Sequence, residues 1–202
     1  MRKILINNKE YEIGLSFYRT YGSVNQQYIE VSNEDISNED SSLFTGRIFH
    51  YVTCVNSGKL YFIKEYHTDK YMAFEEYQVS NLFPDHNNVM NILEVDDGKL
   101  LCEFVYGVQF SRLGTVIINH ILPTVIELVS FIEMFRKKKI DHLIELNLNN
   151  TMLLFDESEQ RYRFKIIDLE TDPKRYDEFR VKNYEFLKIL KKLKKDCKRD
   201  RH

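Results

Sequence analysis

A short apolar run that ends in two carboxylates constrains this chain more than any other feature. Residues 164–167 read Phe-Lys-Ile-Ile, and the paired β-branched residues are typical of a buried strand. Asp168 and Glu170 follow, and the chain then leaves through Thr-Asp-Pro at residues 171–173, a turn signal. A carboxylate placed where a buried strand opens into a loop suits Mg²⁺, which prefers one or two carboxylates together with phosphate oxygens. The same pattern also fits a strand end with a solvated acidic pair, so the choice between these two interpretations depends on the rest of the sequence.

Composition sets the size and the broad class of the protein. With 202 residues, 43% hydrophobic and 30% charged, the chain is expected to form one domain or a small two-lobed domain. Its net charge of -2 argues against a protein devoted to nucleic acid or to anionic membranes. Cys54, Cys102 and Cys197 are far apart and form no metal-binding motif, which favours a reducing compartment. The first residues lack a signal peptide and no apolar run is long enough to span a membrane, so we expect a cytoplasmic protein.

The first half of the sequence has the alternation and the turn residues of an antiparallel sheet. A helix is predicted over residues 70–82, and residues 32–42, which repeat the polar sequence SNED, are predicted to be an exposed loop. The remaining segments are predicted strands and hairpins, over residues 3–13, 28–31, 46–66 and 89–105.

The second half changes to helical periodicity. A helical segment at residues 114–121 precedes a long helix over residues 123–138, which begins with a proline in its first turn. A polar loop at residues 141–150 and a hairpin at residues 152–167 follow. The last predicted helix covers residues 179–195, and four residues are expected on its inward face: Tyr184, Leu187, Leu190 and Leu193.

This order of elements resembles the protein-kinase-like fold. The resemblance covers most of the chain and implies an α+β, two-lobed fold with an antiparallel-sheet N-lobe and a reduced, mainly helical C-lobe. Residues 1–202 would then form a single kinase-like domain. Its N-lobe would cover about residues 1–105, its hinge about 103–107 and its C-lobe about 108–202.

The resemblance implies a nucleotide site in the first half of the chain. Lys64, in the strand Phe62-Ile63-Lys64, would hold the α- and β-phosphates of ATP. Glu75 of the following helix would pair with Lys64, and Glu76 is the neighbouring candidate.

The resemblance also assigns a hinge and a metal ligand. The backbone of the hinge, at Glu103 and Val105, would bind adenine. Asp168-Leu169-Glu170 stands where the DFG motif stands, with Asp168 as the Mg²⁺ ligand.

The loop at residues 141–150 departs from the family pattern H-R-D-x-x-x-x-N, and three registers are open. One register aligns the histidine but puts Ile144 at the position of the catalytic Asp, and another puts Leu146 there. The third register puts Glu145 there and makes Asn150 the second metal ligand. We prefer the third, because it keeps an acid and an amide five residues apart.

Other departures concern the phosphate-binding loop and the end of the chain. No G-x-G-x-x-G motif precedes Lys64, and too few residues follow residue 173 to build an ordinary peptide-docking lobe. The leading hypothesis is therefore an ATP- and Mg²⁺-binding protein that transfers the γ-phosphoryl group to a serine or threonine hydroxyl of a protein. The alternative is a catalytically impaired pseudokinase that acts as a protein-interaction module.

The last predicted helix and the residues after it are rich in lysine and arginine. A solvated helix face, with cations favourably placed near a helix C-terminus, is the preferred interpretation. Contact with nucleic acid or anionic lipid is a second interpretation, which is not favoured because no aromatic residues are interleaved for base stacking. The predicted partner is thus a protein substrate or binding partner. The cations are Lys188, Lys191, Lys192, Lys194, Lys195, Lys198, Arg199 and Arg201.

Overall fold

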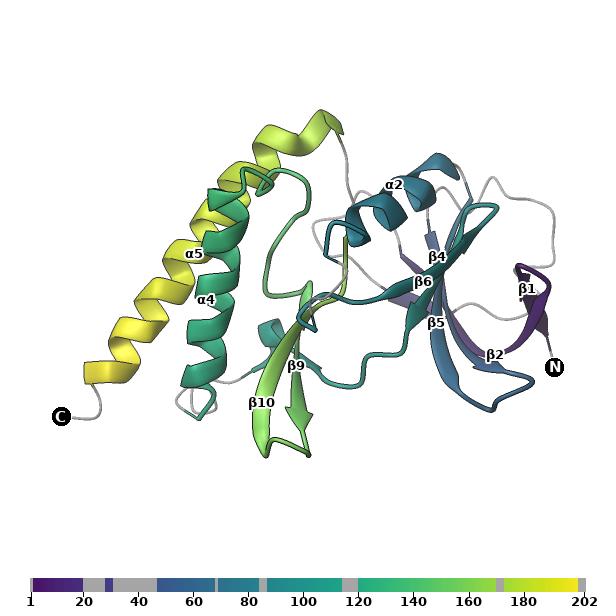
Figure 1. Cartoon of the computed structure of the whole chain (residues 1–202), viewed down its shortest axis with the longest axis horizontal. Helices are drawn as coiled ribbons and strands as arrows, with labels where there is room; N and C mark the ends of the chain where they lie inside the picture. Colours follow the sequence, from purple (N-terminus) through teal and green to yellow (C-terminus); the bar gives the residue numbers. More distant parts are fainter. Residues whose placement is uncertain are drawn as a thin grey trace. The chain divides into compact units, whose positions relative to one another are not determined.

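The chain is described by a computed structural model (Figure 1). The structure describes residues 2–19, 28–30, 47–67, 69–83, 87–113, 120–169 and 173–199. The chain divides into two compact units. Unit 1 comprises Met1–Leu82 and Asn91–Phe104, and unit 2 comprises Phe83–Met90 and Val105–His202.

Unit 1 is built on an antiparallel sheet of seven strands in the order β1-β2-β4-β5-β7-β6, with β3 paired to β2. Tight turns set the register of its hairpins. Asn7 and Asn8 both have positive φ (48° and 64°), which matches the predicted turn of the first hairpin. Asp97 and Gly98 do the same between β6 and β7, with φ of 40° and 80°. The strands are β1 Lys3–Ile6, β2 Lys9–Arg19, β3 Tyr28–Glu30, β4 Arg47–Cys54, β5 Leu60–Tyr66, β6 Ile92–Asp96 and β7 Lys99–Glu103.

The two ends of this sheet meet, so the sheet curls around its own core. The backbone N–H of Asn7 donates to Asp96 Oδ2 (2.8 Å), and its side chain donates to Glu94 Oε2 (2.9 Å). Lys9 also pairs with Glu94. The enclosed apolar cluster is drawn from five strands and consists of Ile4, Ile6, Tyr11, Ile13, Val52, Ile63 and Leu101.

Helix α2 (Tyr71–Ser80) lies against the sheet of unit 1 (Figure 1). Its buried residues are Ala73, Glu76 and Val79, spaced every three residues along one face. The helix is shorter than predicted at both ends. Leu82, the last residue of the predicted helix, lies beyond α2 and is 54% exposed.

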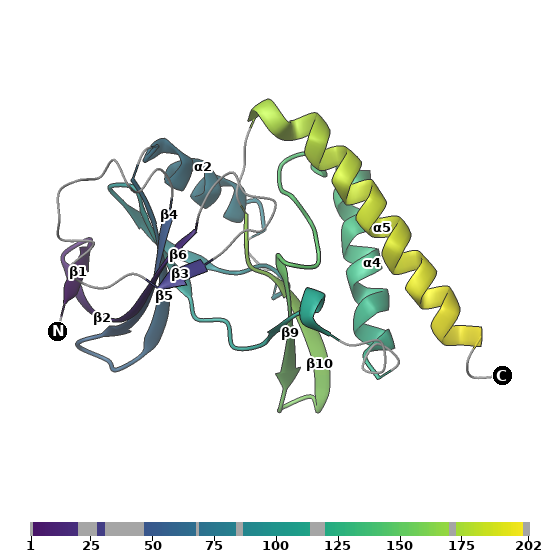
Figure 2. The same ribbon diagram turned by 180° about the vertical axis from the view of Figure 1, so that it is seen from behind.

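Unit 2 combines a small sheet with two helices. Strands β8 (Val108–Gln109), β9 (Thr151–Asp156) and β10 (Arg161–Ile166) pair in the order β10-β9-β8. Helices α4 (Leu122–Lys137) and α5 (Tyr176–Arg199) lie side by side in both ribbon views (Figures 1 and 2). Two single 3₁₀ turns, η2 (Phe110–Arg112) and η3 (Pro173–Arg175), complete the unit.

The core of unit 2 lies between α4 and β10. The ring of Phe131 on α4 packs against Phe164 on β10 with centroids 5.5 Å apart, and Phe135 stacks on Phe83 at 4.8 Å. The apolar residues that form one stripe of α4 are all buried: Val125, Leu128, Val129, Phe131, Ile132 and Phe135.

Helix α5 is longer than predicted, and the described part of its inward face differs by one residue, while the side chain of Leu193 lies outside the described ones. Leu187 and Leu190 are buried as expected, but Tyr184 is 44% exposed and the prediction for it is wrong. Asn183 takes the buried position beside it. The predicted polar loop at residues 32–42 lies outside the described residues, as do residues 114–119 of the predicted helical segment.

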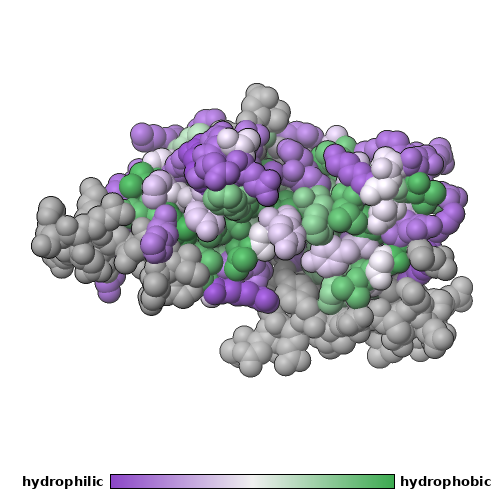
Figure 3. All heavy atoms as spheres, turned by 90° about the horizontal axis from the view of Figure 1, so that it is seen from below, coloured by the Kyte–Doolittle hydropathy of each residue, from purple (hydrophilic) through white to green (hydrophobic). Residues whose placement is uncertain are grey.

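A helix that spans a membrane needs about 20 consecutive, mostly apolar residues. None of the helices in the described ranges is long and apolar enough to cross a membrane. On the face shown in Figure 3, hydrophobic and hydrophilic residues are interspersed.

Candidate functional site

Lys64 and Glu76 form a buried ion pair in unit 1. Lys64 lies in β5 and Glu76 in α2, and Lys64 Nζ is 2.5 Å from Glu76 Oε1. Lys64 is 2% exposed and Glu76 is fully buried. An isolated buried charge is very costly, and here the two opposite charges lie in direct contact.

Tyr66 and Arg47 extend this pair into a network. Tyr66 lies two residues after Lys64, on the same face of β5, and its hydroxyl donates a hydrogen bond to Glu76 Oε2. The guanidinium of Arg47 on β4, itself 1% exposed, lies 5.3 Å from the centroid of the Tyr66 ring. The network fixes the Lys64 ammonium from a strand and a helix at once.

The pairing of Lys64 with Glu75 was predicted wrongly. Glu75 lies one residue from the buried face of α2 and is only half-buried, whereas Glu76 falls between Ala73 and Val79 on that face. A shift of one residue rotates a helical side chain by about 100°, so only one of two adjacent glutamates can face the sheet. The sequence offers both glutamates as candidates, but it does not show which of the two faces the sheet.

Aromatic rings cover the part of the sheet that carries Lys64. Phe62, two residues before Lys64, stacks on Phe49 with centroids 5.7 Å apart and an interplanar angle of 16°. Tyr51 lies 5.4 Å from Phe62 and 5.8 Å from Phe104. Tyr51 is 39% exposed. This surface can stack with a planar ring.

The predicted hinge residues lie at the end of β7 and just after it. Glu103 is held locally, because its N–H donates to the carbonyl of Asn91 (3.0 Å) and its Oε1 accepts from the Asn91 N–H (2.7 Å). Val105 is half-buried and lies outside the strands. The use of this backbone to bind adenine stays a prediction.

The loop at residues 141–150 in unit 2 is anchored by a buried side chain on α5 that sequence reasoning missed. Asn183 Oδ1 accepts from the Leu146 N–H (2.7 Å), and Asn183 Nδ2 donates to the carbonyls of Asp141 (2.6 Å) and Ile144 (2.8 Å). Asn183 is fully buried. A single asparagine on the apolar face of an amphipathic helix, between Phe179 and Leu187, was the signal that could have revealed it.

Within this loop the structure brings Glu145 and Asn150 together. Asn150 Nδ2 donates to the main-chain carbonyl of Glu145 (3.1 Å), and the Asn150 N–H donates to Asn147 Oδ1 (2.9 Å). Ile144 and Leu146, the alternatives at the acidic position, are both fully buried. Glu145 is therefore the one side chain of these three consecutive residues that reaches solvent.

The carboxylate of Glu145 is engaged by two cations of the C-terminal segment. Lys182 Nζ lies 2.9 Å from Glu145 Oε1, and Arg175 Nη2 lies 3.6 Å from Glu145 Oε2. Both cations also bind Glu178, and hydrogen bonds from Arg175 and then Lys182 lower the pKa of Glu178 to about 2. This four-residue network ties the loop to η3 and α5.

Asp168 follows β10, and a backbone hydrogen bond of the preceding residue brings it close to Asn150. The N–H of the preceding residue, Ile167, donates to the Asn150 carbonyl (2.9 Å), and Asp168 itself is half-buried. Carboxylate and amide oxygens are ligands that Mg²⁺ accepts. The described residues contain no cluster of three or more His, Cys, Asp or Glu able to hold a metal.

The arrangement of helices and strands in this chain is similar to that in several solved protein structures. The chain aligns with the Rio2 kinase from Chaetomium thermophilum, solved as an ADP/Mg²⁺-phosphoaspartate complex, with a TM-score of 0.51 and 11% identity. The alignment covers 89% of this chain and 71% of that chain.

A second match is the BubR1 kinase domain, with a TM-score of 0.53 and 11% identity over 84% of this chain. Our chain spans 49% of that longer one. No protein-family model matches the sequence, and no curated protein shows significant similarity to it. The chain has a protein-kinase-like fold, with a curled antiparallel sheet and a reduced helical part.

Proposed function

We propose that this protein binds ATP with Mg²⁺ and transfers the γ-phosphoryl group to a serine or threonine hydroxyl of a protein, in the cytoplasm. The observation that carries the proposal is the buried pair of Lys64 and Glu76. A lysine fixed in one position by a buried carboxylate is suited to neutralise phosphate charge without first being ordered.

The other residues have roles that follow from their chemistry. Asp168 and Asn150 would hold Mg²⁺, which shields the charge of the phosphates when bound. Glu145 would orient the attacking hydroxyl, and the rings of Tyr51 and Phe62 offer a stacking surface for a base. Glu103 and Val105 would supply backbone groups to adenine.

Thermal unfolding with and without Mg·ATP tests nucleotide binding. A ligand that binds only the native state at a hundredfold excess over its Kd raises the unfolding free energy by about 2.7 kcal/mol. Asp168→Ala should abolish this stabilisation. Asp177→Ala is the matched control and should keep it, because the Asp177 side chain is fully exposed. If millimolar Mg·ATP leaves the melting temperature of the unaltered chain unchanged, the proposal is wrong.

One observation favours a second candidate, a pseudokinase that acts by protein contact. The Glu145 carboxylate is paired with Lys182 and Arg175, so both of its oxygens already face cations of the chain rather than a substrate hydroxyl. Phosphate transfer to a generic protein substrate distinguishes the two candidates. Turnover that is lost in Glu145→Gln supports the enzyme, while stabilisation by Mg·ATP without any turnover supports the pseudokinase.

A further inference from the structure

Helices α4 and α5 carry a dense group of cations on unit 2. Residues 180–195 of α5 contain seven lysines and arginines but a single acidic residue, Glu185. Helix α4 ends in the basic run at residues 136–139. We call the following six lysines the basic face: Lys137, Lys188, Lys191, Lys192, Lys194 and Lys195.

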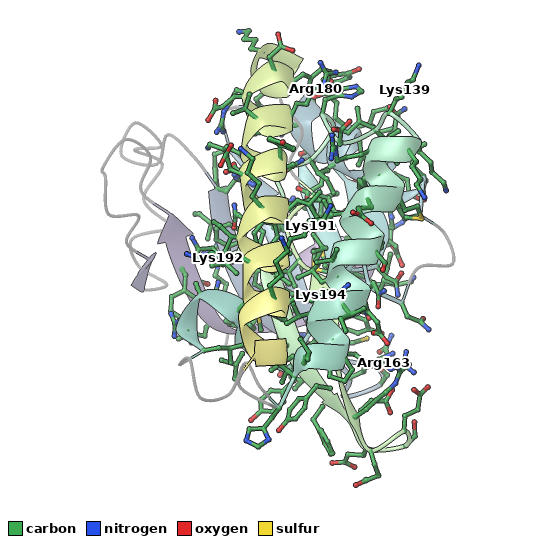
Figure 4. The ribbon with its side chains drawn as sticks, turned by 90° about the vertical axis from the view of Figure 1, so that its left-hand side faces the viewer. Lys139, Arg163, Arg180, Lys191, Lys192 and Lys194 are labelled. Carbon is green, nitrogen blue, oxygen red and sulfur yellow. The ribbon has the colours of Figure 1, made fainter. Side chains whose placement is uncertain are left out.

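An ion pair between α4 and α5 places cations of both helices on one surface. Lys191 Nζ of α5 lies 2.6 Å from Glu133 Oε1 of α4. The hydrogen bond from Lys191, aided by the charges of Lys137 and Lys194, lowers the pKa of Glu133. In Figure 4, Lys191 and Lys194 lie on the side of α5 that is toward α4, and Lys192 lies on its other side.

A tyrosine joins the helices on the same surface. The exposed ring of Tyr184 on α5 has the Arg136 guanidinium 5.2 Å from its centroid and the Lys188 ammonium 4.3 Å from it. Both cations are thus held near the ring while their charged groups remain at the surface. The surface is therefore partly preorganised.

Several cations of the basic face are not neutralised by neighbours. Lys188 pairs with Glu185 and Lys191 with Glu133. Within the described ranges, Lys192, Lys194 and Lys195 make no ion pair. Such a surface holds a surplus of positive charge that favours a partner with closely spaced anions.

We propose that the basic face binds the phosphate backbone of double-stranded nucleic acid, independently of the nucleotide function proposed above. The lysines of the basic face on α5 lie within residues 188–195. At 1.5 Å per residue they extend over about 10 Å of the helix, which corresponds to about three base pairs of a duplex at about 3.4 Å each. Phosphate contacts need only positioned cations and not base stacking, so the scarcity of aromatic residues is no obstacle.

An anionic membrane fits this surface less well. An amphipathic helix binds lipid by inserting an apolar face. In α5 the apolar residues Phe179, Phe186, Leu187 and Leu190 are all buried within the protein. The helix could therefore offer a membrane its charge but not its apolar face.

Fluorescence anisotropy with a labelled duplex RNA or DNA of about 25 base pairs tests the proposal, in a titration at several salt concentrations. Each phosphate contact contributes about -0.9 to the slope of log K against log salt. The variant Lys192→Gln, Lys194→Gln, Lys195→Gln should bind at least about tenfold more weakly at low salt and flatten the slope by about 2.7.

Two further variants keep the test specific. Changing the same three lysines to arginine preserves the charge and should preserve binding. The variant Lys3→Gln, Lys59→Gln, Lys70→Gln removes the same charge from exposed positions of unit 1 and should also bind normally. Asp168→Ala should leave duplex binding intact even if it abolishes the response to Mg·ATP.

The proposal is overturned if no duplex binds at 50 mM salt, or if the unit 1 variant loses as much affinity as the basic-face variant. It is also overturned if vesicles of 30% phosphatidylserine bind the chain under conditions where the duplex does not.

Discussion

The two acidic residues proposed for the site are held in opposite ways. Glu76 is fully buried between a strand and a helix, and its partner Lys64 is 2% exposed. Glu145 lies in an irregular loop, partly exposed, and its partners come from α5 and η3. The first pair is fixed by the packing of regular elements, whereas the second depends on surface ion pairs that water and salt can weaken. The comparison predicts that the first pair is important for stability and that the second can be altered at little cost in stability.

The largest effect should come from breaking the buried pair. Glu76→Ala removes the carboxylate that contacts the buried Lys64 ammonium and accepts from the Tyr66 hydroxyl, and the unfolding free energy should fall by about 3–5 kcal/mol. Urea unfolding followed by circular dichroism measures the change. Glu75→Ala on the same helix should cost less than about 0.5 kcal/mol. Equal losses for the two variants would contradict the assignment of Glu76 as the partner of Lys64.

An intermediate effect is expected where the loop is anchored. Asn183→Leu removes one acceptor and one donor group and leaves the Leu146 N–H and the carbonyls of Asp141 and Ile144 without their partner. The cost in unfolding free energy should be about 3 kcal/mol, because three groups lose their partner and each buried group left unsatisfied costs at least about 1 kcal/mol. The same urea titration measures it. Val181→Leu, at a nearby exposed position of the same helix, is the control and should be nearly neutral. A neutral Asn183→Leu would show that the loop is not held by this side chain.

The smallest effect should come from the surface network around Glu145. The pKa of Glu178 is lowered to about 2 from 4.5 by Arg175 and Lys182. A lowered pKa stabilises the folded state above the unfolded-state value of 4.5, and this stabilisation is lost as the pH falls toward 2. In Glu178→Gln this part of the acid dependence should be absent, so the stability curves of variant and parent should converge below about pH 3.

Glu178 is exposed, so the difference at neutral pH should be small and should shrink further at about 1 M salt. Unfolding curves collected from acidic to neutral pH check this prediction. A variant that differs from the parent equally at every pH would contradict it.

The sequence predicts the regular elements well, because their patterns are local. The alternation of β4 and β5, the turn at Asn7 and Asn8, and the stripe of α4 all depend on residues close together in the chain. The choice between Glu75 and Glu76 failed because the two residues differ only in helical phase, and α2 is too short and too weakly patterned to fix that phase. The residue pattern of α5 did not predict the anchoring role of Asn183, because the backbone groups that its side chain binds lie 37–42 residues away in the sequence.

The closure of the sheet in unit 1 sets an order for the folding of the chain. The hydrogen bonds of Asn7 with Glu94 and Asp96 join residues 87 and 89 positions apart, whereas the hairpins join residues that are close in sequence. Contacts of such long range carry a larger loop-closure entropy and form late. During synthesis the first hairpin can form as soon as it is released, but the barrel-like curl cannot close until residue 96 has left the ribosome. β1 is an end strand of the sheet, and until then its edge, which other chains could extend, is not approached by Glu94 and Asp96 of β6.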